Sequence, residues 1–244
     1  MCVHTANPKF ISKKGYLAGA RLNIPKGYKG SHRNGPLSLQ PIVRNIDSLL
    51  QVDMSQFWLI PDFSKAAKPN YFAVNARDDK MLYSRMWQPI TDRNQRCLIP
   101  INAFFEPHTL KSEQVIEGSE KPTNKVPFRI WLKSAEQFYL AGLWNEWEDK
   151  ETGEVILSHA IITTKANDTL AKIHNAKKRM PVILPETSFD DWLNPDIPTK
   201  ELHKSGLLSP WPDEDIAFTQ ITKQFDYKAS GEELSKPVMD SIEL

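Results

Sequence analysis

The chain has 244 residues, of which 40% are hydrophobic and 25% charged, and this balance suits a globular protein with an ordinary buried core. Its formal net charge of +1 excludes the strong overall positive field of many nucleic-acid binders, although residues 1–50 carry eight Lys or Arg against Asp47 alone and residues 201–244 are acidic overall. Two cysteines exclude a disulfide framework, and the absence of a signal-like or membrane-spanning apolar run favours a cytoplasmic protein.

Strand-like runs dominate the chain. The first 35 residues are basic, with scattered Gly, Asn and Pro, and predict an extended, loop-like segment. Strands are predicted at 57–60, 71–74, 97–105, 128–132, 138–144, 155–164 and 216–219, with a polar surface loop at 111–125. Short helices are predicted at 41–52, 166–175 and 187–193, the last capped by Thr187 or Ser188. We therefore expect one α+β domain over residues 1–244, with a curled, barrel-like, mostly antiparallel sheet and short flanking helices.

Cys2 is the first candidate nucleophile. Once Met1 is removed, this residue offers a thiol and an α-amine on adjacent carbons. The α-amine has a pKa of about 8, so part of it is neutral at pH 7 and can attack an aldehyde to form an imine. The thiol can then close a five-membered thiazolidine ring. The alternative is that a cysteine at position two has no chemical role.

Two further residues have the chemistry of acids and bases. Glu106 follows two phenylalanines at the end of an apolar run, where partial desolvation would raise its pKa and suit it to general acid–base work. The alternative is that Glu106 is an ordinary loop residue just past the end of the strand. His174 ends a predicted helix, where it is either an acid–base group or a solvated helix cap.

Two polar segments near apolar strands are candidates for holding phosphate. Arg77, in Asn75-Ala76-Arg77, stands at a strand end and is suited to a bidentate phosphate contact. Ser84 and Arg85 follow shortly and offer a second contact. For each arginine the alternative is a surface ion pair.

Cys97 opens an apolar strand, so we interpret it as a core residue. No metal is expected, because the remaining histidines show no ligand spacing: His4, His108, His159 and His203.

Taken together, these segments resemble the SRAP family, the SOS response-associated peptidases or abasic-site processing proteins. The matched segments follow the family order over most of residues 1–195: Met1-Cys2, Asn75-Ala76-Arg77, Ser84-Arg85-Met86 with Pro89, Arg96-Cys97-Leu98-Ile99-Pro100, Phe104-Phe105-Glu106, residues 138–144, Thr163-Thr164, Ile173-His174, residues 179–184 and, as a weaker match, Trp192-Leu193. Residues 196–244 are expected to be the C-terminal part of the same domain.

The resemblance implies a function and a role for each site residue. Cys2 would form a thiazolidine with the aldehyde of an abasic site in single-stranded DNA and so shield the lesion. Asn75 would hold the crosslinking centre, Glu106 would protonate the sugar oxygen, and His174 would assist proton transfer and reversal. The residues expected to bind DNA are Arg77, Ser84, Arg85, Lys177 and Arg179. The resemblance also implies autoproteolytic and lyase-like activity without a cofactor, in a monomer that associates with the nucleoid when bound to DNA.

The chain departs from the family pattern in four places. Cys2-Val3-His4 replaces Cys-Gly-Arg, Asp79 replaces Glu, Pro107 replaces Trp, and four residues separate His174 from Arg179, a longer gap than usual.

Three other functions remain open. The first is a self-processing cysteine peptidase that acts through Cys2 on proteins. The second is a passive single-strand-binding module in which Cys2 is incidental. The third is a cysteine protease that uses Cys97 with His174, which the expected burial of Cys97 disfavours.

Overall fold

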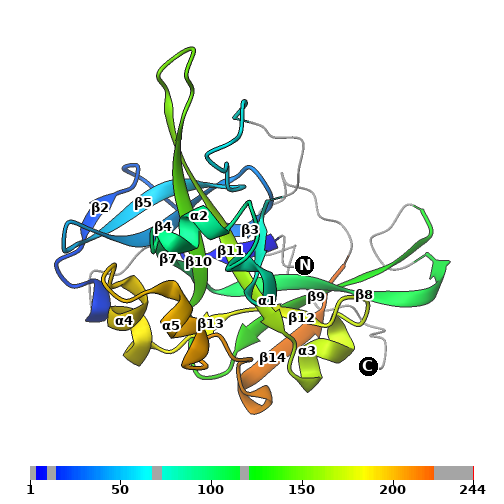
Figure 1. Cartoon of the computed structure of the whole chain (residues 1–244). Coiled ribbons are helices and arrows are strands. Elements are labelled where there is room, and N and C mark those ends of the chain that lie inside the picture. The colour runs from blue at the N-terminus through cyan, green and yellow to red at the C-terminus, as the bar shows by residue number, and fades with distance from the viewer. Residues whose placement is uncertain (1–3, 10–14, 68–72, 116–120, 223–243) are drawn as a thin grey trace.

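The structure, a computed structural model, describes residues 4–9, 15–67, 73–115, 121–222 and Leu244 (Figure 1). Five of its strands close into a barrel in the order β5-β4-β7-β10-β11, and a parallel pairing of β11 with β5 completes the ring. Their bounds are β4 (Leu39–Ile46), β5 (Leu49–Phe57), β7 (Arg96–Ile101), β10 (Phe138–Glu148) and β11 (Val155–Lys165). All six residues of β7 are buried, because both faces of this central strand are covered.

Short strands extend the barrel sheet at its margins. They are β2 (Arg21–Asn23), which pairs with β5, β6 (Asn75–Arg77) and β12 (Arg179–Pro181), which pair with β11, and β13 (Ile183–Leu184), which pairs with β10. The arrangement places β6 and β12 on the same strand, β11, although about one hundred residues separate them in the sequence.

A second sheet packs beside the barrel. Its order is β14-β9-β8-β1-β3, and all of its pairings are antiparallel: β14 (Ile216–Gln220), β9 (Thr123–Leu132), β8 (Ala103–Gln114), β1 (His4–Asn7) and β3 (Ser31–Asn34). Asn102 alone separates β7 from β8, so the chain passes directly from the barrel into this sheet.

The helices are short and lie around the sheets (Figure 1). They are α1 (Asp78–Met81), α2 (Gln88–Asp92), α3 (Asp168–Ile173), α4 (Phe189–Leu193) and α5 (Thr199–Lys204), with 3-10 turns at Gly15–Leu17, Glu186–Ser188 and Asp213–Asp215. The side chain of Asn167 caps α3 by accepting a hydrogen bond from the Leu170 backbone N–H at 2.8 Å. Ser188 stands at the N-cap of α4, but its hydroxyl donates to the Pro185 carbonyl instead of capping the helix.

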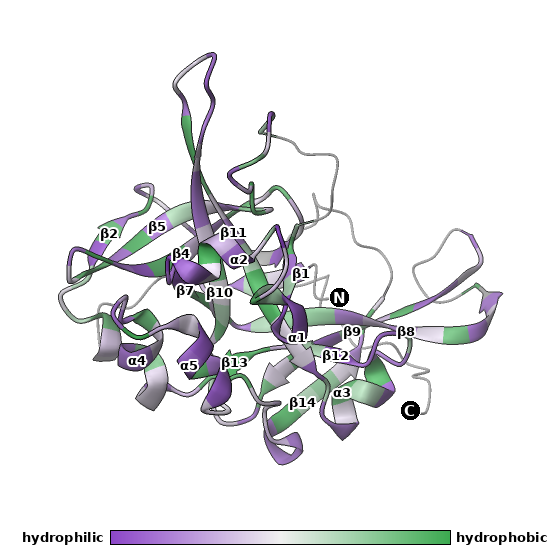
Figure 2. Ribbon diagram, viewed as in Figure 1, coloured by the Kyte–Doolittle hydropathy of each residue, from purple (hydrophilic) through white to green (hydrophobic). Residues whose placement is uncertain are grey.

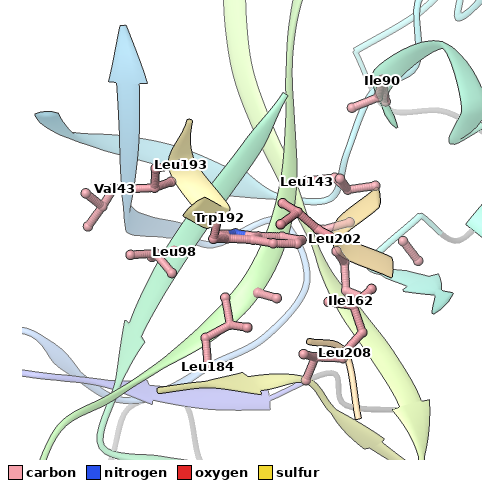
Figure 3. Packing of buried hydrophobic residues seen from close by; sticks show 14 of the residues in the cluster. Val43, Ile90, Leu98, Leu143, Ile162, Leu184, Trp192, Leu193, Leu202 and Leu208 are labelled. Carbon is pink, nitrogen blue, oxygen red and sulfur yellow. The ribbon is translucent and has the colours of Figure 1, made fainter. Parts of the chain in front are cut away.

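Side chains of the barrel strands alternate between two apolar clusters. One cluster gathers around Trp192 of α4, whose indole N–H donates to the Cys97 carbonyl at 2.9 Å. Figure 3 shows Trp192 between Leu98 and Leu193 on one side and Leu143 and Leu202 on the other. The other cluster joins the barrel to the second sheet and to α3. Figure 2 shows hydrophobic residues along the central strands and hydrophilic residues toward the tip of the projecting β10–β11 hairpin.

The expected fold class is confirmed, and most predicted strands are present, but the helix expected at 41–52 is wrong. These residues form β4 and β5, joined by a two-residue turn in which Asp47 and Ser48 both have positive φ, at 52° and 65°. A turn of this kind matches the twist of an antiparallel hairpin. Pro41, the first residue of the predicted helix, lies within β4 instead.

Two predicted loops also contain strands. The loop-like segment at 1–35 contributes β1, β2 and β3, although residues 1–3 and 10–14 lie outside the described residues. In the loop predicted at 111–125, β8 continues to Gln114 and β9 begins at Thr123. The strand expected at 71–74 falls partly on residues 68–72, which the structure does not describe.

Candidate active site

Glu106 lies on β8 with its side chain turned into the protein. It is 1% exposed and stands opposite Phe128 of β9. The strand alternation that buries Phe104 in the apolar cluster places the Glu106 carboxyl on the same face, two residues along. Burial raises the pKa of Glu106 to about 7, because the surroundings disfavour the charged form. The carboxyl can therefore hold a proton near neutral pH.

His174 ends α3 and faces Glu106. Its Nδ1 lies 3.6 Å from Glu106 Oε2 and 3.0 Å from the carbonyl oxygen of Arg179. Because a carbonyl only accepts, Nδ1 carries the proton in the neutral ring and Nε2 keeps the lone pair. Burial lowers the pKa of His174 to about 4, and the positive charges of Lys125 and Lys177 act in the same direction. The neutral imidazole is thus the stable form near pH 7.

Asn75 and Arg77 lie on β6, next to β11. Asn75 is buried and stands beside Ile161 in a parallel pairing, whereas the Arg77 side chain is 45% exposed. The Arg77 guanidinium makes two hydrogen bonds to the Asp79 carboxylate, at 2.9 and 2.5 Å. Arg77 therefore reaches solvent as part of an ion pair.

Arg179 is held by acidic and carbonyl oxygens. Its Nη2 lies 2.6 Å from Asp78 Oδ1 and also donates to the Thr163 carbonyl, and its side chain is 13% exposed. Thr164 donates to the other oxygen of Asp78 at 2.8 Å. Because the Arg179 carbonyl accepts the hydrogen bond from His174 Nδ1, Arg179 belongs both to this ion-pair network and to the surroundings of the Glu106–His174 pair.

The remaining residues expected to bind DNA lie at the surface or in a turn. Arg85 is exposed, with its guanidinium carbon 5.0 Å from the centre of the Phe63 ring. Lys177 is exposed in the loop between α3 and β12. The Ser84 hydroxyl accepts from the Met86 backbone N–H, and its carbonyl accepts from Trp87 and Gln88 at the start of α2. Ser84 therefore shapes the turn that carries Arg85.

Cys2 lies outside the described residues, which begin at His4, two positions further along the chain. His4 starts β1 and pairs with Phe105 of β8, the residue directly before Glu106. The described part of β1 therefore begins beside the strand position that carries Glu106.

Cys97 is fully buried in the apolar core, as expected. Burial raises the pKa of its thiol, which opposes thiolate formation and argues against a protease based on Cys97 and His174. Among the described residues, no group of three or more His, Cys, Asp or Glu side chains is placed to hold a metal ion. No helix in the described part of the chain is long and apolar enough to cross a membrane.

Three residues that sequence reasoning missed support the site. Asp78 pairs with Arg179, and Asn175 and His108 join the His174 loop to β8. The sequence carries no signal for these contacts, because each joins segments at least 66 residues apart.

Comparisons with known proteins agree on one family. The family model described as SOS response associated peptidase (SRAP) matches residues 1–226. The abasic site processing protein YoqW of Bacillus subtilis (strain 168) is 31% identical over 201 residues, which cover 82% of this chain and 82% of YoqW. The abasic site processing protein HMCES of Gallus gallus is 27% identical over 217 residues, which cover 81% of this chain and 61% of HMCES.

Two solved structures share the fold of this chain. The crystal structure of a protein from Bacteroides thetaiotaomicron matches with a TM-score of 0.77 and 25% identity, and the match covers 98% of this chain and 100% of that one. A second crystal structure, from Bordetella bronchiseptica, matches with a TM-score of 0.71 at 22% identity over 91% of this chain and 100% of that one. The fold agrees with the family match, and this chain belongs to the SOS response associated peptidase (SRAP) family.

Proposed function

We propose that this protein processes abasic sites in single-stranded DNA by forming a covalent thiazolidine through Cys2. The single observation that carries the proposal is the buried Glu106–His174 pair, in which Glu106 directly follows Phe105, the partner of His4 in β1. A carboxyl whose pKa lies at about 7 suits proton donation near neutral pH. The names of relatives such as YoqW support the same class of substrate.

The first step is opening of the abasic sugar. An abasic sugar is mostly closed as a hemiacetal, and its ring oxygen needs a proton as the ring opens. Glu106 in its neutral form donates that proton, and the hydroxyl on the anomeric carbon gives up its own proton as the aldehyde forms. His174, with the Nε2 lone pair available in its neutral tautomer, receives a proton during this exchange.

The crosslink then forms in two bond-making steps. The neutral α-amine of Cys2 adds to the aldehyde carbon, and loss of water leaves an imine. The Cys2 sulfur adds to the same carbon, its proton passes to the nitrogen, and the five-membered ring is complete. Ring closure removes the imine before it can lead to β-elimination and strand breakage, so the DNA strand stays intact.

Phosphate contacts position the strand in this proposal. Arg77, Arg85 and Lys177 are exposed and have the charge and reach to bind backbone phosphates. Arg179 was also expected to bind DNA, but Asp78 and the Thr163 carbonyl already hold its guanidinium. We therefore assign Arg179 to holding the site together, and Ser84 to shaping the turn before Arg85.

The test is incubation of the protein with a single-stranded oligonucleotide carrying an abasic site, followed by denaturing electrophoresis. We expect an adduct that survives denaturation, and none with an intact oligonucleotide. Cys2→Ser keeps the amine and loses the thiol, so it should give an imine that borohydride traps but no stable adduct. Cys97→Ala is the control and should crosslink normally. A wild-type protein that binds the oligonucleotide without any adduct would support the passive binding module instead.

A further inference from the structure

The loop that carries His174 is tied to the strand that carries Glu106. His174 ends a helix of six residues, and the chain then turns through Lys178, whose φ is 50°, before β12 begins at Arg179. A helix this short is not rigid by itself. The 3.6 Å contact between His174 and Glu106 therefore needs a further constraint that fixes the loop relative to β8.

Asn175 supplies such a constraint. Its Oδ1 accepts the Thr109 backbone N–H at 2.9 Å, and its Nδ2 donates to the Thr109 carbonyl at 2.9 Å. One side chain thus satisfies both backbone groups of a residue on β8, as a neighbouring strand would. Thr109 lies three residues after Glu106 on the same strand, and Asn175 directly follows His174.

The contact between Asn175 and Thr109 lies on the edge of β8 that faces away from β9. β1 pairs with β8 as far as Phe105, and β9 pairs with Thr109 from the opposite edge. The backbone groups of Thr109 that meet Asn175 therefore lie on the edge of β8 beyond the end of β1. Among the described residues, the pairing of β1 with β8 ends at Phe105, so Glu106 and Thr109 both lie on β8 beyond it.

His108 adds a second tie between the same two segments. Its Nδ1 lies 2.9 Å from the Lys172 carbonyl and must donate to it, which leaves Nε2 as an acceptor for Asn175 Nδ2 at 3.3 Å. The bonds of His108 and Asn175 together connect β8 to the last turn of α3 and to the residue after His174.

We infer that Asn175 is a positioning residue that holds His174 against Glu106, with His108 as its auxiliary. This inference rests on the proposed function for its catalytic consequence, but the geometry that it describes can be tested without DNA. A misplacement of about 1 Å in a catalytic group costs as much as 10²-fold in rate. Loss of Asn175 should therefore slow adduct formation, whereas binding to undamaged DNA, to which Arg77 and Arg85 contribute from outside this loop, should change much less.

The test compares Asn175→Ala with Asn167→Ala in the full chain. Asn167 is a matched control because its side chain also makes two hydrogen bonds to backbone groups, to Leu170 and Trp211, at the other end of α3 and away from β8. Nuclear magnetic resonance of the His174 imidazole nitrogens across a pH titration reports the position and protonation of the ring. Single-turnover crosslinking and binding of undamaged single-stranded DNA are measured in parallel.

We expect Asn175→Ala to change the His174 titration and to slow crosslinking about 10-fold or more, with affinity for undamaged DNA within about twofold of wild type. Asn167→Ala should lower thermal stability but leave the titration near that of wild type. Equal changes in both variants, or no change in Asn175→Ala, would overturn the inference. If Asn175→Ala does not fold, His108→Phe is compared with wild type and with Asn167→Ala: it should change the His174 titration where Asn167→Ala does not, and an unchanged titration would again overturn the inference.

The two proposals fail in different ways. A wild-type protein that forms no adduct contradicts the proposed function, while the His174 titration of the variants still decides whether Asn175 positions the ring. A wild-type protein that crosslinks, together with an Asn175→Ala variant that matches it in rate and titration, contradicts the inference alone.

Discussion

His174 Nδ1 lies 3.6 Å from Glu106 Oε2, and the two residues reach this contact from different parts of the fold. Glu106 comes from β8 of the second sheet, whereas His174 ends the helix that follows barrel strand β11. Burial raises the pKa of the carboxyl to about 7 and lowers that of the imidazole to about 4. Between these values both groups are neutral, so a carboxylic acid and a neutral base face each other at the junction of the two sheets.

The first prediction concerns Glu106→Gln. Glutamine keeps the size and polarity of the side chain but cannot donate the proton that opens the sugar, so adduct formation should slow by about 10²-fold or more. His174→Ala should slow formation or release with little effect on DNA affinity. Single-turnover crosslinking followed on denaturing gels measures both. Unchanged rates in both variants would remove the acid–base assignment.

The second prediction is the pH dependence of the rate. The proposed reaction needs protonated Glu106, whose pKa is raised to about 7, and a neutral α-amine, whose pKa is about 8. The wild-type rate should therefore rise with pH to a plateau between about 7 and about 8 and fall at higher pH. Glu106→Gln, which has no proton to lose, should keep its reduced rate above pH 8. A fall of the same size in that variant would show that another group titrates.

The third prediction is a pH-dependent difference in stability. The pKa of Glu106 is raised on folding from its ordinary 4.5 to about 7, so the folded state binds more protons than the unfolded state between these values. The stabilising contribution of protonated Glu106 is present below about pH 4.5 and is lost as the pH rises to about 7. The free energy of unfolding of Glu106→Gln minus that of wild type should therefore increase by about 1–3 kcal/mol when the pH is raised from 5 to 8.

Urea unfolding of both proteins at the two pH values measures this difference. His174, whose pKa is lowered, acts with the opposite sign, since its contribution is lost as the pH falls from 6.5 to about 4. It is present in both proteins and so largely cancels when they are compared. A stability difference that is the same at pH 5 and pH 8 would contradict a buried, proton-holding Glu106.

The sequence predicted the strands of this fold better than its turns. The strands at 138–144 and 155–164 were visible because long runs of their apolar and β-branched residues are buried on both faces, and the strand at 128–132 because its apolar residues alternate with partly buried ones. The hairpin of β4 and β5 was missed because Asp47-Ser48 lacks the Asn-Gly or Asp-Gly signal of a two-residue turn. Closure of the barrel by β11 and β5 joins residues about one hundred positions apart, and no local pattern encodes it.

The candidate site likewise depends on contacts that no local sequence pattern encodes. The position of Glu106 after two phenylalanines predicted its desolvation, and the structure places the side chain at 1% exposed. The contact with His174 depends on how two sheets and α3 pack together, and the pairing of Arg179 with Asp78 depends on β6 and β12 both lying beside β11. Residue type indicated which groups can do chemistry, but only the packing determines which of them meet.

The fourth prediction concerns the exposed arginines. Arg77→Ala and Arg85→Ala should each weaken binding to undamaged single strands and flatten the salt dependence by roughly one phosphate contact. Asp79→Asn tests the same surface in the opposite direction, because the Asp79 carboxylate forms an ion pair with Arg77 in the wild-type protein. Its removal should strengthen binding and steepen the salt dependence. Titrations by fluorescence anisotropy at several salt concentrations measure both effects, and affinity that does not respond to salt would contradict phosphate binding at this surface.

The fifth prediction concerns Met1. With Met1 attached, the nitrogen of Cys2 is an amide whose lone pair is delocalised into the carbonyl, so it cannot add to an aldehyde. The thiol alone can give only a reversible hemithioacetal. The active protein should therefore have an intact mass lower than the full 244-residue chain by one methionine residue. A chain with an uncleaved N-terminal tag should fold and bind DNA but form no stable adduct. If mass spectrometry shows that the tag is retained while crosslinking reaches full yield, the α-amine of Cys2 is not the nucleophile.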